Sequence, residues 1–109
     1  MEIRLADLEA MAEIAIRTLY SCYVFRITEP KASRGLLSGG RLGTKPRDAF
    51  LANTFLGTNG YISKKDRLAT GYKAMFYLGG TGPEVITTSI ITELAFAATK
   101  PTNSSPEDC

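Results

Sequence analysis

The sequence contains no histidine and no tryptophan, and only two of its 109 residues are cysteines. Without an imidazole, neither a Ser-His or Cys-His nucleophile pair nor a His-ligated zinc site is possible, because each needs a group that exchanges a proton or a lone pair near neutral pH. Two cysteines do not form a disulfide framework, and we expect Cys22 and Cys109 to be free thiols, with Cys22 in the core. The composition therefore predicts a protein that is not an enzyme, with no catalytic residue, metal or cofactor.

Long apolar runs are also missing. The best candidate for a membrane span, residues 85–98, falls short of the roughly 18 apolar residues that a spanning helix needs, and it contains Glu93. No secretory signal is recognisable, because the first residues include Glu2 and the apolar run over 14–25 is interrupted by Arg17. We expect a soluble protein of the cytoplasm or of an organelle interior, neither secreted nor spanning a membrane.

The length allows one core. A chain of 109 residues buries roughly 65% of its unfolded surface on folding, and a 44% share of apolar residues is enough for one compact domain. We expect this domain to cover residues 1–98. Residues 99–109 contain two prolines, two serines and two acids, and this composition predicts a disordered polar tail.

The charge is unevenly distributed along the chain. Residues 26–73 hold ten Lys and Arg against three Asp and Glu, whereas acids outnumber bases in both flanking segments. A cluster of Lys and Arg attracts phosphates or carboxylates and so predicts an anionic partner. The alternative is that water solvates these cations or that the acidic ends of the chain neutralise them.

Apolar residues spaced three or four apart predict an amphipathic helix over residues 5–22. These residues are Leu5, Leu8, Ala12, Ala15, Leu19 and Cys22. A helix with so wide an apolar side must be covered by its own chain or by a partner, and the first five of these residues are our candidates for packing against a partner helix. Aromatic and β-branched residues between 20 and 27 allow one short strand after this helix.

Three further helices are predicted over residues 48–57, 64–78 and 85–98. Asp48 is a candidate N-cap, while Ser63 with Asp66, and Thr81 with Glu84, have the spacing of a capping box. The β-branched residues 85–88 leave a strand open for the last of them. The predicted fold class is therefore mainly α, with three to four helices around one small core.

Residues 28–47 contain two prolines and four glycines and show no sustained period. This composition predicts a long, irregular, basic loop, and a loop of this length inside a small domain is commonly functional or disordered.

These features together predict a non-enzymatic structural or accessory subunit of a larger macromolecular assembly. We expect it to contact a protein partner through the apolar N-terminal helix and an anionic surface through the basic loop. The alternative is a nucleic-acid-binding accessory protein that contacts phosphates through the basic segment 26–73. The candidate residues for binding an anion or a partner are Arg34, Arg41, Lys45, Arg47, Lys64 and Lys65.

Overall fold

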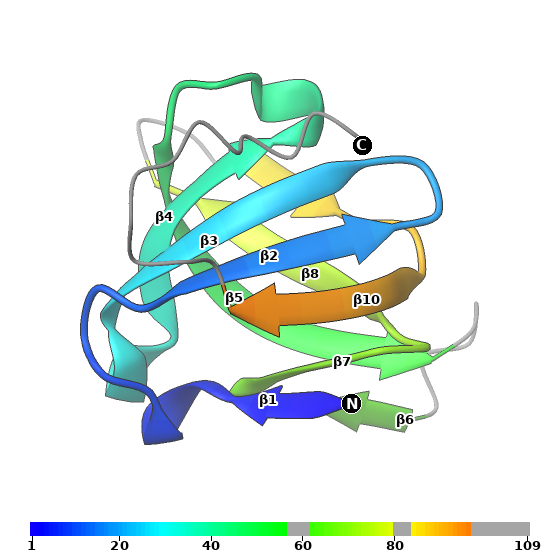
Figure 1. The fold of residues 1–109 in the computed structure, drawn as a ribbon, viewed down its shortest axis with the longest axis horizontal. Helices are drawn as coiled ribbons and strands as arrows, with labels where there is room; N and C mark the ends of the chain where they lie inside the picture. Colours follow the sequence, from blue (N-terminus) through cyan, green and yellow to red (C-terminus); the bar gives the residue numbers. More distant parts are fainter. Residues whose placement is uncertain (57–61, 80–83, 97–109) are drawn as a thin grey trace.

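The protein is an antiparallel β-structure in the computed structural model, which describes residues 1–56, 62–79 and 84–96 (Figure 1). Within these ranges no helix reaches seven residues. The predicted mainly α fold is therefore wrong. The predicted polar tail 99–109, and Cys109 with it, lies outside the described residues.

The described residues form ten strands and three short 3-10 turns. The strands are β1 (Glu2–Arg4), β2 (Glu13–Thr18), β3 (Cys22–Glu29), β4 (Arg34–Gly39), β5 (Arg47–Leu56), β6 (Ile62–Lys64), β7 (Arg67–Ala69), β8 (Lys73–Leu78), β9 (Glu84–Thr87) and β10 (Ile91–Phe96). The turns are η1 (Leu5–Asp7), η2 (Pro30–Ala32) and η3 (Gly40–Leu42).

Alternating burial explains why these segments are strands. In β2, Ile14, Ile16 and Thr18 are buried, while the residues between them are half-buried or exposed. The same alternation appears in β3 and β8. Because successive side chains of a strand point to opposite faces, these three strands contribute every second residue to the core. The predicted helix over 5–22 is instead a 3-10 turn, a connection and strand β2.

The other predicted helices are corrected in the same way. Residues 48–56 belong to β5, residues 64–78 contain β7 and β8, and residues 84–96 contain β9 and β10. The expected irregular loop over 28–47 contains the six-residue strand β4, flanked by η2 and η3. Gly35 in β4 permits this pairing, because a Cβ there would lie only 2.1 Å from the Arg26 carbonyl oxygen.

The strands form one large sheet in the order β10-β2-β3-β4-β5-β8-β9, with β6 beside the second half of β5. Its two ends are joined by the continuous segment from β9 to β10. At this junction the Ile91 N–H donates to Tyr72 O over 2.9 Å, and the Leu19 N–H donates to Ile90 O over 3.1 Å. Residues 90–91 thus hold backbone next to the start of β8 and the end of β2 at once, and the sheet rolls into a barrel that is closed at this point and open along β9.

The apolar core fills the inside of this barrel. Phe25 of β3 and Phe76 of β8 are fully buried and meet edge to face, with ring centroids 5.0 Å apart. The small sheet of β1 and β7 lies across one end, where Ile3, Leu5 and Leu68 are buried. In Figure 1 this end is at the bottom, and the turn that follows β4 is at the top.

Candidate functional site

The six cations predicted to bind an anion do not gather in one place. Arg41 lies in η3, and Lys45 lies in the connection between η3 and β5, at the top of Figure 1. Lys64 and Lys65 lie at the opposite end, at and just after β6. Arg34 is exposed on the outside of β4, at the start of the strand. The basic segment of the sequence is therefore spread over the molecule.

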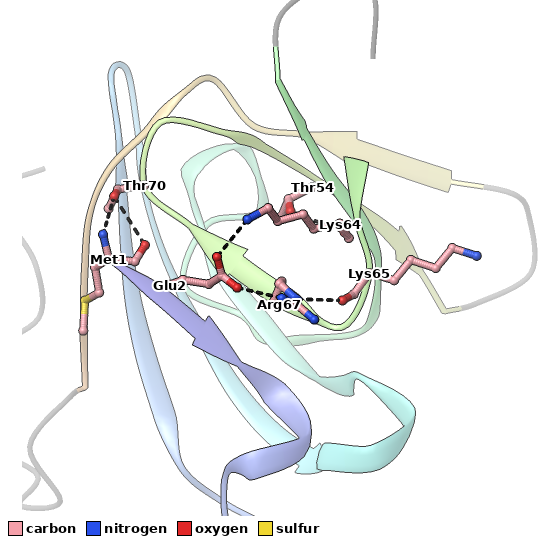
Figure 2. Close-up of polar contacts among 7 residues, drawn as sticks. All are labelled: Met1, Glu2, Thr54, Lys64, Lys65, Arg67 and Thr70. Carbon is pink, nitrogen blue, oxygen red and sulfur yellow. Dashed lines mark hydrogen bonds and ion pairs between the residues drawn. The ribbon is translucent and has the colours of Figure 1, made fainter. Parts of the chain in front are cut away.

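Lys64 is held by a carboxylate of its own chain (Figure 2). Glu2 accepts a hydrogen bond from Lys64 Nζ at 2.9 Å and another from Arg67 Nη1 at 2.8 Å. Lys64 Nζ also lies 5.2 Å from the centre of the Tyr72 ring. The hydrogen bonds from Lys64 and Arg67 lower the pKa of Glu2, and the bond to Glu2 raises the pKa of Lys64. These contacts, which we call the Glu2 cluster, fasten β1 to the segment 64–67.

Arg47 is also paired within the chain. Its Nη2 lies 2.7 Å from Glu84 Oε1, so the pair joins the start of β5 to the start of β9. The hydrogen bond to Glu84 raises the pKa of Arg47, and the same bond lowers the pKa of Glu84. Of the six predicted cations, Arg34, Arg41, Lys45 and Lys65 form no ion pair with any residue in the described ranges.

The five residues predicted to pack against a partner helix do not share a face. Leu5 is fully buried in η1, Leu8 packs against the core, and Leu19 is 56% exposed in the turn after β2. Ala12 precedes β2, and Ala15 lies on its outer side. The helix that was to present them is absent from the fold, so the helical docking surface is wrong. A role in binding for any one of them stays a prediction.

The prediction for Cys22 is also corrected. Its side chain is half-buried at the start of β3, outside the apolar core, and it is disulfide-bonded. Cys22 is therefore not a free thiol.

A row of exposed side chains that the sequence did not reveal crosses the outside of the barrel. Phe50 of β5 is paired with Tyr77 of β8, and Tyr77 is paired with Val85 of β9. The Phe50 and Tyr77 rings are stacked at 11° with their centres 6.3 Å apart. They are 39% and 48% exposed, and Val85 is 45% exposed. On the other side of Phe50 the row continues to Arg34 of β4.

We call this row, together with the half-buried Met75, the aromatic face: Arg34, Phe50, Met75, Tyr77 and Val85. Phe50, Tyr77 and Val85 fall in three different predicted helices, 48–57, 64–78 and 85–98, so a helical pattern does not bring them together. A period of two would have identified them, because Phe50, Tyr77 and Val85 each alternate with a buried neighbour.

The described part of the chain offers little that resembles a small-molecule or metal site. Two hollows of about 190 and 340 Å³ are shallow, and the larger one lies between η1 and η2. Across the described ranges, no three His, Cys, Asp or Glu residues lie together as metal ligands would. Within residues 1–56, 62–79 and 84–96 there is no helix long and apolar enough to span a membrane.

Comparison with known proteins adds no relative. No protein-family model, no curated protein and no solved structure matches this chain.

Proposed function

We propose that this chain is a non-enzymatic accessory subunit of a larger assembly and that it binds a protein partner through the aromatic face. The observation that carries this proposal is the continuous exposed row of Arg34, Phe50, Tyr77 and Val85 across four neighbouring strands. Contiguous apolar side chains of this kind on a soluble protein commonly mark an interaction site.

The residue types of the aromatic face support a protein as the partner. Tyr, Phe, Met and Arg are enriched at the centres of protein interfaces, whereas Lys, Glu and Asp are depleted there. Phe50 and Tyr77 are already stacked on each other, and aromatic side chains have only two side-chain torsions, so covering them costs little side-chain entropy. Arg34 adds a planar donor at the edge of the face.

The alternative, a nucleic-acid-binding accessory protein, has weaker support. Phosphate contacts require cations along a common track, but Lys64 and Arg47 are paired with Glu2 and Glu84, and Arg41 lies at the other end of the barrel from Lys65. Retention of the purified chain on a polyanion column, measured at increasing salt, tests this alternative. A steep loss of retention with salt would favour it over the aromatic face.

Site-specific photo-crosslinking in the native host tests the proposed function. A photoreactive phenylalanine analogue replaces Tyr77 in the aromatic face, and a matched variant carries it at Tyr20, which is 85% exposed in the turn between β2 and β3. We expect cross-linked species of defined mass from position 77 that position 20 does not give. Their yield should fall when Phe50→Ser removes the neighbouring ring.

Equal labelling from positions 77 and 20, or cross-links at 77 that are insensitive to Phe50→Ser, would contradict docking through the aromatic face. The Phe50→Ser variant must first show the circular dichroism spectrum and melting temperature of the original chain, so that a lost cross-link is not the result of unfolding.

A further inference from the structure

Strand β9 has one side that no described strand covers. It pairs with β8 and with no other strand of the described residues. The pairing also fixes which backbone groups point away from β8. The Thr88 N–H donates to Ala74 O over 2.8 Å, in continuation of the register Met75 to Thr87. In an antiparallel pair these bonding positions alternate, so Glu84, Ile86 and Thr88 face β8.

The remaining residues of β9 therefore direct their backbone outward. Val85 and Thr87 point both N–H and C=O away from β8, and both residues are exposed. Within the described residues no turn or loop hydrogen bond uses these four groups. Together they form a short but complete template for one more antiparallel strand.

Apart from its short length of four residues, β9 itself lacks the features that usually prevent edge-to-edge association. Natural sheets protect exposed edges with unpaired charges, prolines or bulges. The charged residue of β9 is Glu84, and its carboxylate is already bonded to Arg47 at 2.7 Å. The other residues, Val85, Ile86 and Thr87, are β-branched and favour strand pairing.

We propose that two copies of this chain associate by antiparallel pairing of β9 with the partner's β9, about a two-fold axis at Ile86. In this register Val85 lies opposite the partner's Thr87, and the symmetric contact places Thr87 opposite the partner's Val85. Each of the two pairs exchanges two N–H to C=O hydrogen bonds, so four backbone bonds join the copies. A closed two-fold contact of this kind uses the same surface on both chains.

Other registers of the β9–β9 pair are less favourable than an axis at Ile86. A shift by one residue would place the outer-face residue Val85 opposite the core-face residue Ile86 of the partner, which the period of the pleat forbids. An axis at Val85 would leave one hydrogen-bonded pair between the two copies of β9, Val85 with the partner's Val85, because Thr87 would then lie beyond Glu84, the first residue of the partner's β9. The axis at Ile86 also avoids like charges, because Glu84 then faces the partner's Thr88.

The contact is small, and we expect a weak, concentration-dependent dimer, as for interfaces below about 1,200 Å². It goes beyond the proposed function and does not depend on it. Edge pairing uses backbone groups at the rim of the sheet, whereas Phe50 and Tyr77 remain uncovered on its outer face. In the dimer the two aromatic faces lie side by side on one continuous sheet.

Two measurements on the purified chain test the dimer. Sedimentation at increasing concentration should show a mass rising from 11.8 kDa toward twice that value. Amide hydrogen exchange followed by NMR should show Val85 and Thr87 becoming protected as concentration rises. The Ile86 amide, which faces β8, should be protected at every concentration.

Two substitutions at Thr87 isolate the contribution of its backbone N–H to the dimer. Thr87→Pro removes an outward N–H and no bond to β8, so the dimer should weaken by at least tenfold in Kd. Thr87→Ala keeps this N–H and should dimerise like the original chain. Val85→Lys places a cation on the edge and should weaken the dimer as much as Thr87→Pro does. It replaces Thr87→Pro in the test if the proline variant does not fold.

The proposal is overturned by a chain that stays monomeric at the concentrations used for NMR. It is also overturned by a dimer that persists in folded Thr87→Pro, or by one whose Val85 and Thr87 amides exchange freely. A dimer lost in Phe50→Ser but kept in Thr87→Pro would show that the aromatic faces, and not the β9 edges, join the copies.

Discussion

At the scale of single residues, Glu2 determines which cations are available to a ligand. Lys64 binds one of its carboxylate oxygens and Arg67 binds the other, so the local excess of positive charge is partly neutralised within the chain. Arg4 stands directly opposite Arg67 in the β1–β7 pair, and like charges in that position repel. The Glu2 carboxylate therefore holds β1 against a repulsion that the two arginines create.

The Glu2 cluster makes stability depend on pH in a defined direction. The folded-state pKa of Glu2 is lowered, so its contribution is present above the ordinary glutamate value of about 4.3 and is lost as pH falls through the folded value. The pKa of Lys64 is raised, so its contribution is present below about 10.4 and is lost as pH rises through the folded value. We expect Glu2→Gln to lower the melting temperature at neutral pH and to flatten its decline below about pH 4.3.

Melting curves between neutral and acidic pH measure this effect. Glu9→Gln is the matched control, because Glu9 is exposed and its carboxylate makes no ion pair within the described residues. A Glu2→Gln variant whose acid response equals that of the original chain would show that the cluster does not fasten β1.

At the scale of elements, Thr88 secures the point where the chain leaves β9. Its side chain is buried, and its Oγ1 accepts a hydrogen bond from the Ala74 N–H at 3.0 Å while donating to Ser89 O at 2.7 Å. Valine has nearly the same shape but cannot accept that bond. We expect Thr88→Val to cost about 1–3 kcal/mol, the usual penalty of a buried donor left without a partner.

Urea denaturation measures the cost, with Thr88→Ser as the variant that keeps the hydroxyl. The serine variant should retain most of the stability, losing only the methyl group. Equal losses in the two variants would assign the effect to packing and not to the hydrogen bond.

The strands also show why the sequence pattern predicted helices where the fold has strands. Leu5, Leu8, Ala12, Ala15 and Leu19 are spaced like one side of a helix, but in the fold they come from several different elements, and β2 supplies just one of them. The period of two in Ile14, Ile16 and Thr18 is shorter and was masked by apolar neighbours such as Ala15. The β-branched residues 85–88 did point to a strand, and the strand allowed near 20–27 overlaps β3, which runs from Cys22 to Glu29.

The candidate site was predictable only in part for a related reason. The exposed cations Arg34, Arg41, Lys45 and Lys65 could be read from composition, but the pairing of Lys64 with Glu2 joins residues 62 positions apart. The aromatic face likewise depends on the register between β5, β8 and β9, which no local pattern specifies. Long-range pairing of this kind has no signal within a short window of sequence.

At the scale of the whole molecule, the Phe25–Phe76 pair links walls of the barrel that are not neighbours in the sheet. β4 and β5 separate their strands, so the 5.0 Å contact between the rings crosses the interior. We expect Phe25→Ala and Phe76→Ala each to cost about 3–5 kcal/mol, as large-to-small changes in a packed core do. The two losses should be non-additive by about 0.5–1.5 kcal/mol because of the ring contact.

A double-mutant cycle in urea measures the coupling, and Tyr20→Ala, at a residue 85% exposed, should change stability by no more than about 0.5 kcal/mol. Additive losses within error would mean that the two rings stabilise separate parts of the fold.

The junction at residues 90–91 bears on how the molecule comes apart. An open sheet can fray from either outer strand, losing the pairing of one strand at a time. Here both outer strands, β9 and β10, are joined by one short segment of backbone, and residues 90–91 of that segment also bond to Leu19 and Tyr72. Loss of the hydrogen bonds at Ile90 and Ile91 would free both outer strands at once. We therefore expect unfolding to begin as one cooperative opening at these two residues and not as gradual fraying of one outer strand.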